Sequence, residues 1–230
     1  MNRSALARYS HNDSELDGKG VNMSVSFLAA QLRRVRVILA IPLVAAVVTA
    51  LVGRLAAAAW SSMQGMALAF GLGQIFVICS GVAVAIVLTG DPLVELHEAT
   101  PASFRRVQVV RAVAVTASAV IGAVVMFAPL HVAGVWMQDK GWITVVIPIG
   151  SAVTIAAAAF GAAAYTGSAS STTIVVTATW LFLAALWDPY VESLLLRRGI
   201  PVLMATILAI QAWHRLGDPE RNISRAVAAA

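Results

Sequence analysis

The sequence has 230 residues, of which 60% are hydrophobic and 12% charged, and its mean hydropathy is +0.84. Soluble domains carry about 25% charged residues, so this composition excludes a water-soluble globule and indicates an integral membrane protein. The net charge of +5 is explained better by a positive-inside bias than by nucleic-acid binding, and we expect no nucleic-acid partner.

The N-terminal region divides into two segments. Residues 1–20 are polar and rich in Ser, Asn, Asp and Gly, which predicts a disordered cytoplasmic tail. In residues 21–36, apolar side chains at helical spacing precede an arginine cluster, which predicts an amphipathic helix on the inner leaflet. An extension of the first span with snorkelling arginines explains the pattern equally well. The apolar residues are Val25, Leu28, Leu32 and Val35, and the arginines are Arg33, Arg34 and Arg36.

Apolar segments dominate the rest of the chain. They lie at about 37–57, 66–90, 107–129, 143–164, 172–187 and 200–216. A crossing needs roughly 20 residues, so the fifth and sixth segments are each a few residues short. We therefore predict an all-α integral membrane protein, with a six-helix transmembrane domain over 37–216 and a cytoplasmic tail over 217–230.

The segment between the two short spans, residues 188–199, is itself partly apolar. A short span, a half-buried segment and another short span predict a re-entrant element on the outer face, which needs cover from protein or a wet cavity. Asp188 and Glu192 are expected to pair with Arg197 or Arg198 at its mouth.

The positions of the basic residues predict the orientation. In the predicted topology, twelve lie on the side of the membrane that holds the N-terminus, and four lie on the opposite side. The twelve are Arg3, Arg8, Lys19, Arg33, Arg34, Arg36, Arg105, Arg106, Arg111, Arg215, Arg221 and Arg225, and the four are Arg54, Lys140, Arg197 and Arg198. Because cytoplasmic loops carry the excess of Lys and Arg, we expect both termini in the cytoplasm and a multi-pass protein of the cell membrane.

The connection between the second and third spans holds the most specific local signals. Asp91 can cap a helix whose first residue is Pro92, and Thr100 before Pro101 ends that helix after about two turns. Glu95 is three residues from Glu98, so these carboxylates share one helix face. A helix that docks a cytoplasmic partner and a capped, solvated loop helix both fit this pattern.

The stretch G-D-P-x-x-E-L-H-E-A-T-P-x-x-x-R-R, residues 90–106, resembles the cytoplasmic loop of ABC-2 type (exporter-type) ABC transporter permeases. The general plan of six spans behind an amphipathic helix is similar too. The resemblance implies that residues 92–99 form the coupling helix, which docks a cytoplasmic ABC ATPase subunit, and that a second permease half, identical or similar, completes the transporter. The docking residues it implies are Asp91, Pro92, Glu95, Leu96, His97, Glu98, Thr100, Pro101, Arg105 and Arg106.

The sequence lacks the motifs that would indicate enzyme activity or a bound metal ion. The sequence has no G-x-x-x-x-G-K-[ST] phosphate-binding loop, so we expect no enzyme activity and no bound cofactor, and ATP and Mg²⁺ would belong to the partner subunit. The four histidines lack the spacing of a metal site. The expected function is an exporter permease for a lipophilic or amphipathic substrate such as a peptide, drug or lipid. The alternative is a membrane scaffold or sensor without transport.

Overall fold

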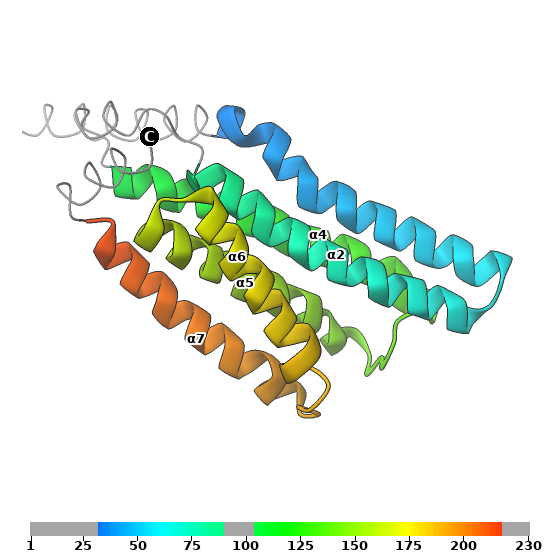
Figure 1. Cartoon of the computed structure of the whole chain (residues 1–230). Helices are drawn as coiled ribbons and strands as arrows, with labels where there is room; N and C mark the ends of the chain where they lie inside the picture. Colours follow the sequence, from blue (N-terminus) through cyan, green and yellow to red (C-terminus); the bar gives the residue numbers. More distant parts are fainter. Residues whose placement is uncertain (1–31, 90–103, 218–230) are drawn as a thin grey trace, which may run out of the picture.

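A computed structural model describes residues 32–89 and 104–217 of the chain (Figure 1). These residues form a helical bundle without a β-strand, and six of its helices are long and apolar enough to cross a membrane. The crossing helices are Leu32–Ala59, α2 (Ser62–Thr89), α4 (Phe104–Val132), η1 with α5 (Trp142–Val145 and Val146–Thr166), α6 with η2 (Ala169–Leu181 and Phe182–Trp187) and α7 (Leu194–Arg215). The predicted all-α, multi-pass architecture is confirmed at this level.

The helices alternate in direction, so the bundle has two distinct ends (Figure 1). The short connections at 60–61, 133–141 and 188–193 gather at one end, which we name the loop end. The described chain ends at Leu32, Thr89, Phe104 and Gly217 gather at the other, which we name the terminal end. The start of the first crossing and the end of the last crossing therefore lie on the same side of the bundle.

Helix α5 is the centre of the bundle and packs against α2, α4, α6 and α7. Its sequence is rich in alanine and glycine, which lets neighbouring backbones come close. Gly81 of α2 lies at the tightest approach, since a Cβ atom there would be 2.2 Å from Cγ2 of Ile155 and 2.7 Å from Cγ1 of Val176. Three helices, α2, α5 and α6, meet at this glycine.

The outer helices keep apolar faces uncovered. In α7, and in α6 with η2, only 17% of the most apolar 18-residue stretch is buried inside the bundle. The corresponding share for η1 with α5 is 61%. Leu203 of α7 and Ile174 of α6 are among the exposed large side chains. Apolar surface of this extent fits contact with lipid or with another membrane helix.

The structure does not confirm a separate re-entrant element. Helix α6 begins at Ala169 and α7 at Leu194, so both crossings are longer than the predicted 172–187 and 200–216. Residues 188–193 form a short connection, and residues 194–199 are the first turns of α7. The predicted segments 1–20, most of 21–36, the coupling residues from Asp91 to Pro101 and the tail from 218 onward lie outside the described residues.

Candidate functional site

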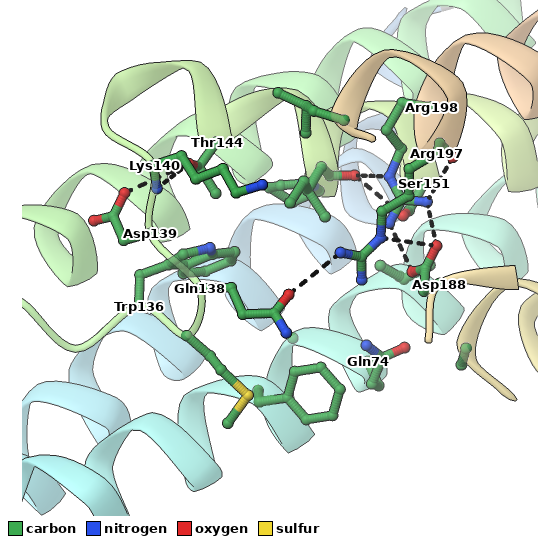
Figure 2. A pocket seen from close by; sticks show the side chains of 18 of the residues that line it. Gln74, Trp136, Gln138, Asp139, Lys140, Thr144, Ser151, Asp188, Arg197 and Arg198 are labelled. Carbon is green, nitrogen blue, oxygen red and sulfur yellow. Dashed lines mark hydrogen bonds and ion pairs between the residues drawn. The ribbon is translucent and has the colours of Figure 1, made fainter. Parts of the chain in front are cut away.

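A cavity of about 730 Å³ opens at the loop end of the bundle (Figure 2). Roughly 300–1,000 Å³ is the usual volume of a small-molecule site, so its size is that of a ligand pocket. Residues from α2, α4, η1, α5, η2, α7 and the connections 133–141 and 188–193 line it. They include Phe70, Gly73, Gln74, Val77, Met126, Met137, Gln138, Asp139, Lys140, Asp188, Glu192, Arg197 and Arg198.

Arg198 anchors the polar wall of the cavity. Its Nη1 and Nη2 donate to Oδ1 and Oδ2 of Asp188 at 2.6 and 2.7 Å, and its Nε donates to the carbonyl oxygen of Ile147 at 3.0 Å. Only 3% of the residue is exposed. A buried charge needs such a bidentate partner, because the desolvation of an unpaired guanidinium is costly. The predicted pairing of Asp188 with Arg198 is therefore present.

Two local features bring this pair together. Segment η2 is a π-helix, and the amide of Asp188 donates to the carbonyl of Leu183, five residues back, at 2.8 Å. Such a π-turn changes the direction in which the following side chain points, and it is often found at functional sites. On α5, Gly150 leaves room for the arginine, since a Cβ atom there would lie 2.7 Å from Cδ of Arg198.

Arg197 is held more loosely than its neighbour. Its Nε lies 3.4 Å from Oδ1 of Asp188, and its Nη1 donates to Oε1 of Gln138 at 3.4 Å. Both distances are long for hydrogen bonds. The backbone is fixed, because the indole Nε1 of Trp187 donates to the Arg197 carbonyl at 2.9 Å. The Arg197 guanidinium is thus positioned on the cavity wall with donor capacity to spare.

Residues 131–144 form a hydrogen-bonded cap beside the cavity. Nδ1 of His131 contacts Oδ2 of Asp139, and the Gly141 amide donates to Oδ1 of Asp139 at 2.8 Å. Burial raises the pKa of the Asp139 carboxyl. The hydrogen bonds from His131 and Gly141 and the charge of His131 outweigh burial, so this pKa lies below its ordinary value.

Aromatic rings brace the same cap. The His131 ring stacks on Phe127 with 5.1 Å between ring centroids, and Trp142 meets His131 edge-on at 4.6 Å. Trp136 packs edge-on against Phe127 at 5.1 Å and also lines the cavity. The cap therefore combines the hydrogen bond between His131 and Asp139 with aromatic packing, which fixes the loop that carries Gln138 and Lys140.

The terminal end carries two stacked arginines. Arg105, in the first turn of α4, places its guanidinium carbon 4.0 Å from the centroid of the Trp213 ring on α7. Arg215 lies 5.2 Å above the ring of Tyr165. Cation–π contacts of this kind tie the start of α4 and the end of α5 to the end of α7. Arg106, the other docking residue that the structure describes, is exposed.

The structure brings together the predicted residues Asp188, Arg197 and Arg198, and Glu192 lines the same cavity. Sequence reasoning missed Gln74, Gln138, Lys140 and Gly150. The polar run Gln138–Lys140 in an otherwise apolar stretch was the available signal for the loop. Within residues 32–89 and 104–217, no group of three or more His, Cys, Asp or Glu residues could hold a metal ion.

No protein-family model, curated protein or solved structure matches the chain.

Proposed function

We propose that the chain is the permease subunit of an ATP-driven ABC exporter in the cell membrane. The stretch at 90–106 carries the proposal, because its residues resemble the coupling loop of ABC-2 permeases and it joins two crossing helices. A separate ATPase subunit would bind ATP and Mg²⁺ and dock on the segment around Glu95 and Glu98. A second permease half, identical or similar, would complete the pathway.

The arrangement of the bundle supports this proposal. Segment 90–103 leaves α2 at Thr89 and enters α4 at Phe104, so it is anchored at the terminal end, away from the cavity. In the proposed orientation the terminal end faces the cytoplasm, where the ATPase would be. The loop end with its cavity then faces outward.

A physical route joins the two ends. Residues 90–103, which we name the coupling segment, lead directly into α4. Arg105, the second residue of α4, stacks on Trp213 in the last turn of α7. Helix α7 continues from Trp213 back to the cavity residues Arg197 and Arg198, a distance of roughly 24 Å at about 1.5 Å per residue. A displacement of the coupling segment would reach the cavity through this helix. An ATPase that binds one state of the permease more tightly would shift the population toward that state.

The substrate class follows from the surfaces. Both apolar and charged side chains line the cavity, and the outer helices α6 and α7 expose large apolar side chains. An amphipathic or lipophilic molecule fits such surfaces better than a fully polar solute does.

Charge reversal in the coupling segment tests the proposal. Glu95→Lys together with Glu98→Lys should abolish co-purification of a P-loop ATPase and substrate-stimulated ATP hydrolysis, since like charges at an interface cost several kcal/mol. Membrane insertion should not change. Asp13→Lys with Glu15→Lys is the matched control, because it makes the same charge change in the N-terminal tail. Normal ATPase binding and transport by the Glu95/Glu98 variant would contradict the proposal and favour a scaffold or sensor.

A further inference from the structure

The charged groups that line the cavity fall into two classes, those that neutralise one another and those that remain. Arg198 and Asp188 satisfy each other through two short bonds. The Asp139 carboxylate is held by His131 and by the Gly141 amide. These groups already form hydrogen bonds within the protein, so they have little capacity left to bind a ligand.

Two cations remain with capacity for an anion. Arg197 has only contacts of 3.4 Å, and its Nε is buried without a hydrogen bond. Lys140 forms no ion pair with any carboxylate of the described residues, and Figure 2 shows its side chain extending from the loop in the direction of Arg197. Glu192, in the 188–193 connection, is the carboxylate lining the cavity that has no cationic partner among the described residues. The uncommitted charge of the lining is thus two positive groups against one negative group.

The cavity lining also contains apolar side chains, and α2 supplies several of them. Phe70, Val77, Met126 and Met137 are among these side chains, and the α2 stretch from Ala69 to Val77 spans roughly 12 Å at about 1.5 Å per residue. Gly73 lies in the middle of this stretch, and a Cβ atom added there would meet nothing within 4 Å. An apolar chain therefore has open space along α2.

We propose that this cavity binds an amphipathic anion, a molecule with a phosphate or carboxylate headgroup and an alkyl tail. The headgroup accepts hydrogen bonds from Arg197 and Lys140, and the tail lies against α2 beside Gly73. The headgroup chemistry is shared by anionic membrane lipids and by free single-chain amphiphiles. This cavity also supports the substrate class of the proposed function, but binding here requires neither the ATPase nor the coupling segment, so the two proposals are tested separately.

Native mass spectrometry of the purified full chain in a non-ionic detergent tests the proposal. The probes are dioleoyl phosphatidic acid for a bilayer lipid, dodecyl phosphate for a free amphiphile, and dioleoyl phosphatidylcholine, dodecanol and inorganic phosphate as comparisons. One phosphatidic acid or dodecyl phosphate should bind per chain, at lower concentration than the comparison probes. Binding of only one of the two anionic probes identifies the source of the ligand.

Four variants locate the site. Arg197→Gln and Lys140→Gln should each weaken binding about tenfold, because each removes a charge-assisted hydrogen bond to the headgroup. Glu192→Gln should strengthen binding, since it removes the uncommitted negative charge. Arg54→Gln is the matched control, an exposed arginine near the same end of the bundle that does not line the cavity, and it should bind like the parent.

A steric pair covers the case in which a charge variant fails to fold. Gly73→Leu should fill the space for the tail and abolish binding, whereas Gly71→Leu, also in open space but outside the cavity lining, should not. Unfolding temperatures of both variants verify that they are folded. Equal binding by Arg197→Gln and Arg54→Gln, or by Gly73→Leu and Gly71→Leu, would overturn the proposal. So would inorganic phosphate that binds as tightly as dodecyl phosphate.

Discussion

The guanidinium of Arg198 and the carboxylate of Asp188 face each other in a bidentate ion pair, with bonds of 2.6 and 2.7 Å. The pair joins the end of η2 to the second turn of α7, and the further bond from Arg198 to Ile147 adds the start of α5. Three crossing helices are thus fastened at the loop end by one buried side chain. This clamp sets the shape of the polar wall of the cavity.

Removal of the carboxylate should destabilise the protein strongly. Asp188→Ala leaves the Arg198 charge buried and unpaired, and breaking a buried pair in this way costs about 3–5 kcal/mol. Thermal unfolding in detergent should show a large drop in midpoint. Glu192→Ala, which removes a carboxylate without a described partner, should change it little. The double variant Asp188→Leu with Arg198→Met should recover most of the loss, because it removes both charges. Equal midpoints for Asp188→Ala and Glu192→Ala would contradict the clamp.

Gly81 should tolerate no side chain. In Gly81→Ala the new methyl group would lie 2.2 Å from Ile155 and 2.7 Å from Val176, so the helices must separate, and overpacking of this kind typically costs about 1–3 kcal/mol. Gly71→Ala on the same helix meets nothing within 4 Å and should instead gain up to about 1 kcal/mol of helix propensity. Unfolding temperatures of the two variants in the same detergent decide the matter. A Gly81→Ala protein as stable as the parent would show that α2, α5 and α6 do not meet there.

The Asp139 carboxylate should make stability depend on pH in the acid range. Its pKa is lowered from an ordinary value of 3.8, so its contribution is fully present above that value and is lost as pH falls through the folded-state pKa. The unfolding midpoint of the parent should therefore exceed that of Asp139→Asn at pH 7, and the difference should shrink below about pH 4. A difference that stays constant down to pH 3 would show that the contact with His131 does not stabilise the charged form.

Hydropathy predicted the number of crossing helices because burial in a bilayer requires long apolar runs, whatever the tertiary packing. It placed the starts of several helices too late, among them those of α6 and α7. The hydroxyl of Thr172 donates to the Ser168 carbonyl at 2.8 Å, and the hydroxyl of Thr173 donates to the Ala169 carbonyl at 2.9 Å. The first turns of α6 therefore contain polar side chains whose hydroxyls are hydrogen-bonded. Arg198 lies inside α7 because Asp188 neutralises it.

The cavity was predictable only in part. The sequence analysis expected Asp188 or Glu192 to pair with Arg197 or Arg198 at the mouth of segment 188–199, and the Asp188–Arg198 clamp is one of these pairs. The contribution of Gly150 was not predictable, because it depends on α5 passing Arg198 at close range, a contact between residues 48 positions apart in the sequence (150 and 198). Gln74 and Lys140 come from two further elements, and only their packing brings them to one cavity.

Orientation gives the last prediction, and two cysteines in a Cys79→Ala background test it. Glu192 lies in a connection at the loop end and Arg106 in the first turn of α4 at the terminal end, and both side chains are exposed. If the excess of basic residues keeps the terminal end in the cytoplasm, Glu192→Cys should react with a membrane-impermeant maleimide in intact cells. Arg106→Cys should react only after permeabilisation. A reporter fused after Ala230 should report a cytoplasmic terminus, since six crossings return the chain to its starting side. The reverse labelling pattern would place the segment at 90–106 outside the cell, where no cytoplasmic ATPase could reach it, and the proposed function would fall with the orientation.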